Sequence, residues 1–366
     1  MVEAGLAGLF IASPVDDVFG RHSQNRRYVS GFTGSTGYVV ITETQAIIGV
    51  DSRYTEQAQR ESVSNGFRVF DIKGKRSEAC AGMIAQAGLG RKKLGISGAD
   101  LSYGEFAKLN TALGEIAAGD RPIVSAAPPI VEKLRVRKDA AEMASLERSI
   151  EICDGAYDSV LASLLPGQTE TSVAVAVEQA VRSSGGSGVS FDTIVAGGAW
   201  AAMPHATPRD EPLRDGEMVV IDMGAIFGGY CSDLTRTTML GTDDARFREI
   251  YGIVFEAQQA AIEGVEVGMT GVQADRLARD VIESAGYGEQ FGHGLGHGVG
   301  LEVHEIPYLG PSSEDVLEEG MVFTIEPGIY IPGWGGVRIE DIVVLEGGRA
   351  RVLSHAEKLV PAGAQG

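Results

Sequence analysis

Cysteine is scarce in this chain of 366 residues, which contains three, Cys80, Cys153 and Cys231. The number is odd and no Cys-x-x-Cys pair occurs, so the spacing indicates no disulfide framework. A chain of this length also folds without disulfide bonds. We expect three reduced thiols, as is typical of a cytoplasmic protein.

Positive charge is also in deficit. The chain has 31 lysine and arginine residues against 50 aspartate and glutamate residues, a formal net charge of −19. This sign opposes binding to a phosphate backbone or to an anionic membrane. No apolar run approaches the ~18 residues of a membrane-spanning helix, and Met1 to Ala12 lacks the basic start of a signal peptide. We expect a soluble cytoplasmic protein that binds neither nucleic acid nor membrane.

The length and the residue pattern predict two domains. Up to about residue 125, strands alternate with helices, and Tyr38–Thr42 with Ala46–Val50 reads as a hairpin. Two prolines at 128 and 129 interrupt this pattern. We therefore expect an α/β domain over residues 1–130 and a second domain over residues 131–366.

The second domain combines helices with antiparallel hairpins. Apolar residues recur at helical spacing in Asp139–Leu165, Thr169–Ser183, Phe247–Glu263 and Val272–Ser284. β-rich segments come in adjacent pairs, which are Glu217–Met223 with Tyr230–Met239, and Met321–Glu326 with Gly336–Leu345. This pattern predicts an α+β domain, so the fold class of the chain is α/β plus α+β.

The first hairpin carries two acids inside apolar strands. A turn centred on Phe227 and Gly228 would place Asp222 directly opposite Asp233. Like charges that face each other across two strands are destabilising, and a divalent cation between them would remove the conflict. The alternative is a register one residue different, in which one of the two aspartates is solvated.

The second hairpin repeats this feature, with Glu326, Glu340 and Asp341 inside apolar runs. Because strand side chains alternate between faces, Arg338 and Glu340 are expected to lie on one face. Two acidic hairpins in one domain favour a metal site over two solvated surfaces.

The histidines add nitrogen ligands, because four of the six lie between residues 205 and 304. They are His205, His293, His297 and His304. Glycines alternate from residue 292 to residue 300 around two of them, a spacing that suits close backbone packing rather than a helix. The segment matches neither G-x-G-x-x-G nor H-E-x-x-H.

Four carboxylates with one or two imidazoles form a hard, oxygen-rich ligand set with enough negative charge for two divalent ions. Manganese or cobalt fits this set best, and zinc or iron is an alternative. Two such ions can lower the pKa of a shared water and stabilise the tetrahedral intermediate of a hydrolysis. The chain has no G-x-S-x-G and no P-loop motif, so the pattern indicates metal-dependent hydrolysis.

The order Asp222, Asp233, His297, Glu326, Glu340 resembles the ligand signature of the pita-bread metallopeptidases, which include methionine aminopeptidase, aminopeptidase P and prolidase. Longer motifs are similar to the proline-specific branch: SGFTGSTGYVVIT, VDSRYTEQA, MPHATP, IDMGAIFGGYCSDLTRT, GHGLGHGVGLEVHEIP, VFTIEPGIYIPG and GGVRIEDIVVL. The resemblance runs from about residue 5 to residue 358. It implies a creatinase-like amino-terminal domain followed by a pita-bread catalytic domain.

The resemblance also implies roles for the matching residues. Asp222, Asp233 and Glu340 would hold one metal ion, and Asp233, His297, Glu326 and Glu340 the other. Glu326 would take a proton from the attacking water.

Four further residues would act on the substrate or on the ligands. His205 and His304 would bind substrate and stabilise the reacting carbonyl. His293 would lie near the substrate, and Arg338 would orient the metal ligands.

The implied function is hydrolysis of Xaa-Pro dipeptides by a homodimer that uses two divalent ions, manganese first among the candidates. Aminopeptidase P activity on longer peptides with proline at the second position is an alternative, and an inactive binding module is an alternative of another class. The chain departs from the family at Trp200 and Ala201, where a small polar pair is usual, which leaves the shape of the pocket open. Arg209 and Arg338 are the basic side chains close in sequence to the site that could hold a free carboxylate.

Overall fold

The computed structural model describes residues 1–12, 23–98, 100–242 and 244–359. The chain divides into two compact units, Met1–Arg135 and Val136–Gly366. No helix within the described ranges is both long enough and apolar enough to cross a bilayer. None of the three cysteines forms a disulfide with a described residue, and all three are buried.

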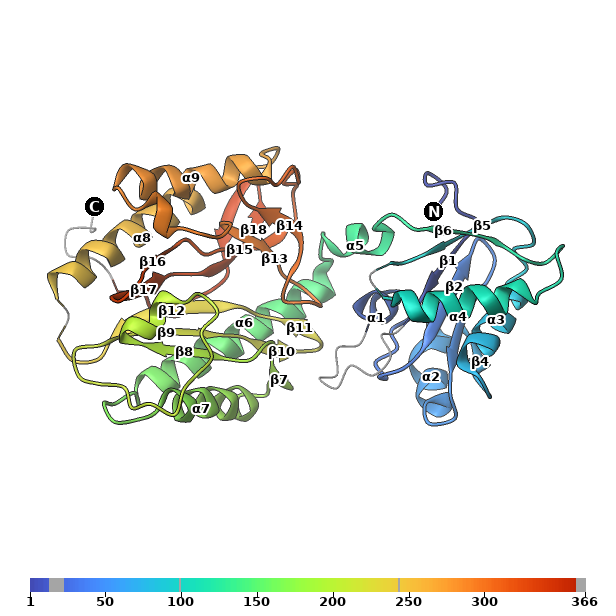
Figure 1. The fold of residues 1–366 in the computed structure, drawn as a ribbon, viewed down its shortest axis with the longest axis horizontal. Helices are drawn as coiled ribbons and strands as arrows, with labels where there is room; N and C mark the ends of the chain where they lie inside the picture. Colours follow the sequence, from blue (N-terminus) through green and yellow to red (C-terminus); the bar gives the residue numbers. More distant parts are fainter. Residues whose placement is uncertain (13–22, 99, 243, 360–366) are drawn as a thin grey trace. The chain divides into compact units, whose positions relative to one another are not determined.

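The first unit is built on one mixed sheet of six strands in the order β4-β3-β2-β1-β5-β6 (Figure 1). Its strands are β1 Gly8–Ile11, β2 Tyr38–Thr42, β3 Ala46–Val50, β4 Arg68–Asp71, β5 Lys93–Ile96 and β6 Ile123–Ala126. Its α-helices are α1 Gln24–Ser30, α2 Thr55–Ser62, α3 Arg76–Gln86, α4 Tyr103–Gly114 and α5 Ile130–Arg135. The predicted hairpin is confirmed, because β2 and β3 pair antiparallel with those bounds.

The two faces of this sheet bury separate apolar clusters. Phe10, Tyr38 and Val40 pack with α3 and α4 on one face. Leu9, Val39 and neighbouring residues pack with α2 and α5 on the other. The alternation of side chains along β1 and β2 therefore divides the core into two layers.

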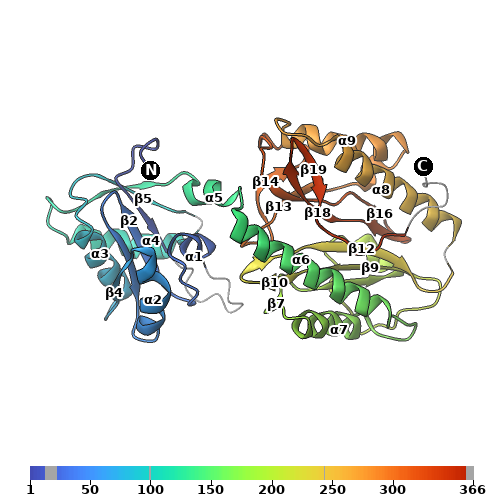
Figure 2. The ribbon, with the colours of Figure 1, turned by 180° about the vertical axis from the view of Figure 1, so that it is seen from behind.

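The second unit contains the four predicted helices, which are α6 Ala140–Leu161, α7 Glu170–Ser183, α8 Ala245–Gly264 and α9 Gly271–Ser284. Each begins after a side chain that caps its first amides, supplied by Asp139, Thr169, Asp244 and Thr270. In Figures 1 and 2, α6 and α7 lie on one side of the strands and α8 and α9 on the other.

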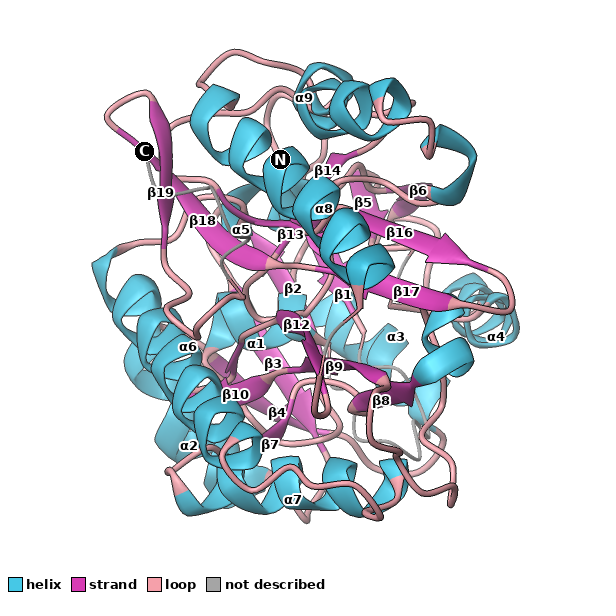
Figure 3. Cartoon of the chain, turned by 90° about the vertical axis from the view of Figure 1, so that its left-hand side faces the viewer, coloured by secondary structure: helices cyan, strands magenta, loops and turns pink. Residues whose placement is uncertain are grey.

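The strands of the second unit form several small sheets. Its strands are β7 Gly188–Val189, β8 Ile194–Gly197, β9 Met218–Met223, β10 Ala225–Phe227, β11 Tyr230–Cys231, β12 Leu234–Met239, β13 Gly296–Gly298, β14 Glu305–Leu309, β15 Val322–Ile325, β16 Gly328–Ile331, β17 Gly335–Arg338, β18 Asp341–Glu346 and β19 Arg349–Val352. The sheet orders are β11-β10-β7, β12-β9-β8, β14-β13-β15-β18-β19 and β16-β17. Figure 3 shows α8 running across the strands of the second hairpin.

The register predicted for the first hairpin is wrong. Asp222 pairs with Thr235 instead of Asp233, and Phe227 pairs with Tyr230. The turn is therefore Gly228–Gly229, and both glycines have positive φ, at 59° and 92°. Two-residue hairpin turns favour such residues, and Phe227 could not adopt that conformation without strain.

The correction moves the register by two residues, which keeps the same side chains on the same face. Asp233 lies between β11 and β12 and is 5% exposed, and the Asp222 side chain is 13% exposed. The alternative of a one-residue shift with a solvated aspartate is therefore also wrong.

The second hairpin has a single register through β15, β16, β17 and β18. Ile325 pairs with Asp341, and Gly328 pairs with Arg338. Glu326 and Glu340 lie opposite each other in the gap between these two pairs. The hairpin thus brings its two glutamates together on adjacent strands.

The alternating glycines permit close backbone contacts, as the sequence predicts. A Cβ atom on Gly296 would lie 2.0 Å from the carbonyl oxygen of Thr324, and one on Gly298 would lie 2.3 Å from that of Ile306. Neither space admits a side chain. The two glycines therefore let β13 fit between β14 and β15. His297 is the central residue of β13, between these two glycines.

Candidate metal centre and active site

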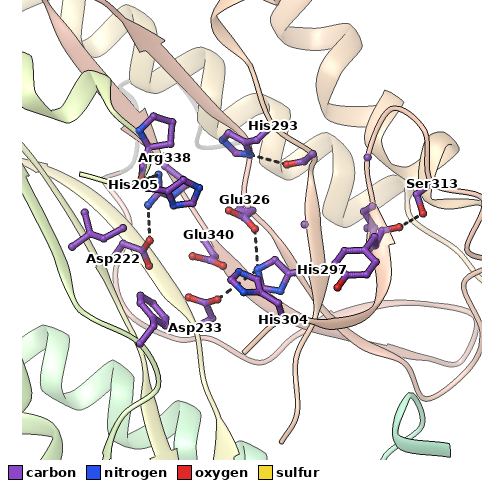
Figure 4. Close-up of a pocket in the computed structure, with 18 of the residues that line it drawn as sticks. His205, Asp222, Asp233, His293, His297, His304, Ser313, Glu326, Arg338 and Glu340 are labelled. Carbon is purple, nitrogen blue, oxygen red and sulfur yellow. Dashed lines mark hydrogen bonds and ion pairs between the residues drawn. The ribbon is translucent and has the colours of Figure 1, made fainter. Parts of the chain in front are cut away.

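One cavity of about 850 Å³ in the second unit is lined by all nine residues to which the family resemblance assigns a role. These residues are His205, Asp222, Asp233, His293, His297, His304, Glu326, Arg338 and Glu340. Figure 4 shows their side chains directed toward one another from both acidic hairpins and from the segment around His297. The structure therefore brings together residues that are up to 135 positions apart in the chain, from 205 to 340.

A tight group of possible ligand atoms lies at the centre of this cavity. One ligand atom each from Asp233, His297 and Glu340 falls within 4.8 Å of the others, and all three residues are buried. Nε2 of His297 is 3.7 Å from Oδ2 of Asp233 and 3.3 Å from Oε1 of Glu326. These separations suit atoms that share a cation.

His297 is oriented by its own strand. Its Nδ1 lies 3.1 Å from the carbonyl oxygen of Gly298, and its backbone N–H donates to Thr324 Oγ1 at 3.1 Å. A proton on Nδ1 leaves Nε2, which faces Asp233 and Glu326, as the ligand atom.

Asp222 lies at the same cavity but has a different neighbour. Nη2 of Arg338 donates to its Oδ2 at 2.6 Å, while its buried Oδ1 has no hydrogen-bond partner among the described residues. A buried carboxylate oxygen without a donor is costly, and a cation would satisfy it. Among the described residues, Asp222 stands outside the group of Asp233, His297 and Glu340.

Thr235 links the two sides of the site. Its hydroxyl donates to Oε2 of Glu340 at 2.7 Å and accepts from Nε of Arg338 at 3.0 Å. Arg338 and Glu340 therefore share one face, as predicted. Arg338 is further held by Tyr330 Oη at 2.8 Å and by the carbonyl oxygen of Pro204 at 3.3 Å.

Four buried carboxylates compete for protons in this cavity. Burial raises the pKa of Asp222, Asp233 and Glu340, and the neighbouring carboxylates raise it further. For Glu326, burial also acts to raise the pKa, but hydrogen bonding and charge from His297 lower it to about 2. Four acids buried in one cavity are thus unfavourable without cations, and bound divalent ions would compensate their charge.

The remaining histidines surround this centre. The ring of His304 lies 4.1 Å from that of His297, centroid to centroid. Nε2 of His293 is 3.0 Å from Tyr330 Oη, and burial lowers the pKa of His293. His205 follows Pro204, whose carbonyl oxygen is bound to Arg338. All three imidazoles line the cavity in which a substrate carbonyl would lie.

Arg209 does not serve as a cation of this cavity. Its Nη2 and Nε donate to the two carboxylate oxygens of Glu170 at 2.7 and 3.0 Å, and its guanidinium stacks over Trp200 at 4.3 Å. Among the described lining residues, Arg338 is the only lysine or arginine, and neither Trp200 nor Ala201 takes part. The departure from the family pattern at Trp200 and Ala201 therefore leaves the lining of the cavity unchanged. Trp200 instead packs against Arg209 and so supports the loop that carries His205.

Sequence reasoning missed the threonines of the site. Thr235 binds Glu340, and the Thr324 hydroxyl donates to Oε1 of Glu326 at 3.2 Å. Each lies two residues from a proposed ligand, Asp233 or Glu326, on the same strand face. The two-residue period of strands was the signal that could have found them.

We expect manganese ions to stabilise the chelated protein. At ~100 times the dissociation constant, binding contributes about 2.7 kcal/mol, which raises the melting temperature of a unit of this size by roughly 5 to 10 °C. Calorimetry with and without the ion measures the shift. It should be clearly smaller in His297→Ala, which removes a ligand of one of the two ions, and persist in full in the matched control His355→Ala, whose side chain is exposed. An unchanged shift in His297→Ala would contradict the assignment.

The chain is similar to known peptidases over nearly its whole length. A sequence profile of metallopeptidase family M24 matches residues 144–346, and one of the creatinase/prolidase N-terminal domain matches residues 1–137. A Bacillus subtilis (strain 168) protein named "Uncharacterized peptidase YqhT" is 40% identical over 96% of this chain and 97% of its own.

Two solved structures extend the comparison. An Xaa-Pro dipeptidase from Bacillus anthracis has a TM-score of 0.89 at 38% identity, covering 98% of this chain and 95% of its own. An X-Pro aminopeptidase from Thermotoga maritima MSB8 has a TM-score of 0.86 at 34% identity, covering 98% and 97%. The predicted fold is confirmed, and the chain belongs to metallopeptidase family M24, with a creatinase-like amino-terminal domain before a pita-bread catalytic domain.

Proposed function

We propose that this protein hydrolyses the peptide bond between an amino-terminal residue and proline, acting on Xaa-Pro dipeptides. The observation that carries the proposal is the convergence of four buried carboxylates and His297 in a cavity that also holds three further imidazoles. The similar structure from Bacillus anthracis is named an Xaa-Pro dipeptidase, which supports the same substrate class.

We assign the divalent ions to five residues. Asp222, Asp233 and Glu340 would hold one ion, and Asp233, His297, Glu326 and Glu340 the other. When bound, the ions lower the pKa of water and polarise the scissile carbonyl. Manganese fits the oxygen-rich set best, with cobalt or zinc as alternatives.

The side chains around the ions perform the proton transfers and bind the substrate. Glu326, whose pKa is low, is ionised and accepts a proton from the attacking water. His205 and His304 donate hydrogen bonds to the developing oxyanion, and His293 lies against the substrate. Arg338 holds Asp222 and Thr235 in position, so its role is to orient ligands.

Proline explains why donors to the carbonyl oxygen matter here. It lacks an amide proton and its φ is fixed, so a peptidase that depends on that proton and on an extended backbone binds it poorly. A site for proline must gain its binding energy from the carbonyl oxygen and the ring. The imidazoles of His205 and His304 supply donors for that oxygen.

Aminopeptidase P activity is the second candidate, because a cavity of about 850 Å³ is near the upper end of small-molecule sites and can hold more than a dipeptide. The Thermotoga maritima relative is named an X-Pro aminopeptidase. A binding module without activity is disfavoured, since all five ligand positions are filled.

Paired substrates separate these candidates. We expect a higher kcat/KM for Ala-Pro than for Ala-Pro-Ala, because the dipeptide's free carboxylate can bind the cavity imidazoles. Both should be measured on chelated protein reconstituted with manganese, cobalt or zinc. The reverse order would assign aminopeptidase P activity, and faster turnover of Ala-Ala than of both would contradict proline specificity.

We also propose a cytoplasmic homodimer. Three buried thiols that form no disulfide with a described residue suit a reducing compartment, and two-domain members of the proline-specific branch commonly pair. Light scattering at micromolar concentration should give about twice the 38.5 kDa of one chain. A mass of one chain throughout the concentration range would rule the dimer out.

A further inference from the structure

A second cavity, of about 320 Å³, lies in the amino-terminal unit between α3, α4 and the sheet. Its lining shares no residue with the catalytic cavity. The apolar part is formed by Phe10, Leu101 and Leu109, and the polar part by residues at the start of α3 and on α4. The volume suits one small organic molecule.

The start of α3 supplies free backbone donors to this cavity. Lys75 is the N-cap residue of the helix, and no described side chain caps the first turn. The first intrahelical bond near this end runs from the Ala79 N–H to the Lys75 carbonyl oxygen. The amides of the preceding turn therefore have no partner within the helix, and the helix dipole favours an anion beside them.

Tyr38 provides a second, independent observation. It lines the same cavity and is 4% exposed, yet its buried hydroxyl has no hydrogen-bond partner among the described residues. Burial raises the pKa of Tyr38, and the groups that influence it next, Cys80, Arg76 and Glu105, also line the cavity. The hydroxyl is thus a protonated donor within the wall of this cavity, and an unpaired buried donor is costly.

The charges around the cavity favour a single negative charge on the ligand. Lys75 is paired with Glu78 at 2.9 Å. Arg76 and Lys108 form no ion pair with a described residue. Glu105 offsets one of these two cations while it closes the capping box with Ser102. The side chains around the cavity therefore carry one net positive charge, although the net charge of the whole chain is −19.

We propose that this cavity binds a small carboxylate with an apolar or aromatic body. The carboxylate would lie at the start of α3 between Arg76 and Lys108, within reach of the Tyr38 hydroxyl. The body would contact Phe10, Leu101 and Leu109. This site is independent of the peptidase function.

Calorimetric titration of the full chain with sodium phenylacetate tests the proposal, with the protein kept in chelator so that metal ions hold none of the probe. We expect saturable binding of one molecule per chain, with a dissociation constant of order millimolar. Phenylethanol, which keeps the ring without the charge, and acetate, which keeps the charge without the ring, should bind at least about tenfold more weakly. Phenyl phosphate, a dianion, should also bind more weakly.

Variants locate the binding. Arg76→Gln with Lys108→Gln should weaken binding at least about tenfold, and Tyr38→Phe about threefold or more. The matched control Lys92→Gln, an exposed lysine outside the lining, should change nothing, and binding should persist in His297→Ala. Melting temperature and Ala-Pro hydrolysis check that each amino-terminal variant is folded.

Several results would overturn the proposal. They are absence of saturable binding, equal affinity for phenylethanol, or unchanged affinity in the double variant. Loss of binding in His297→Ala would place the probe in the catalytic cavity instead. Conversion of a dimer to a monomer by Arg76→Gln with Lys108→Gln would show that the surface is a subunit contact.

Discussion

Replacing Asp233 by asparagine is expected to abolish hydrolysis of Ala-Pro while the chain stays folded. Asp233 is one of the two acids, with Glu340, that are proposed to bind both ions, and its carboxylate lies within 4.8 Å of the ligand atoms of His297 and Glu340. Loss of a residue that only hydrogen-bonds to a metal ligand lowers metal affinity or activity about 10- to 100-fold. Loss of a ligand shared by both ions should therefore lower kcat/KM by more than about a hundredfold. Steady-state kinetics at saturating manganese measures the effect.

The matched control for this variant is Asp158→Asn, an exposed aspartate on α6 that makes the same chemical change away from the cavity. It should leave kcat/KM and melting temperature unchanged. The chelated Asp233→Asn protein should melt no lower than chelated wild type, because removing one of four buried carboxylates relieves their mutual repulsion. Activity of Asp233→Asn equal to that of wild type would refute the metal assignment.

The acidic hairpins show how much of the site can be predicted from the alternation of residues along strands. The sequence placed Asp222 and Asp233 on one face of one hairpin, and this holds although the register was wrong by two residues. A register shift of two residues keeps every side chain on the same face of the hairpin. The prediction that the two acids share a site therefore did not depend on which residue pairs with Asp222. The adjacent glycines 228 and 229 favour a two-residue turn at that point, and a turn placed there predicts the correct register.

Contacts between distant segments were beyond the reach of sequence pattern. Arg209 is four residues from His205, which suggested a substrate-binding role, but Glu170 on α7 binds its guanidinium and Trp200 packs against it. Glu170 is 1% exposed and also accepts from the Gly197 N–H. Nothing in the local pattern shows that a helix residue 39 positions away would bind this arginine.

A second buried cluster supports the strands behind the metal site. Arg236, on β12, donates to Asp341 at 2.8 Å, to the carbonyl oxygens of Thr235 and Ala356 at 3.0 and 2.8 Å, and to that of Glu340. Asp341 is fully buried and is also bound by Lys358, and by Gln258 at 3.2 Å. The cluster joins β12 to β18 directly beside Thr235 and Glu340, so it fixes the spacing of the two acidic hairpins.

Arg236→Met should therefore destabilise the catalytic unit strongly, because it leaves Asp341 as a buried charge with only Lys358 to balance it. Removing one partner of a buried ion pair costs about 3 to 5 kcal/mol, which lowers the melting temperature of a unit of this size by roughly 10 °C. Calorimetry measures this in the transition that responds to added manganese.

Arg276→Met is the matched control, since Arg276 is 57% exposed and pairs with Asp280 on the surface of α9, where such a pair contributes about 0.3 to 0.5 kcal/mol. Asp341→Leu added to Arg236→Met should recover part of the loss, because it removes the unbalanced charge. Equal shifts in the two arginine variants would show that the buried cluster does not hold the hairpins together.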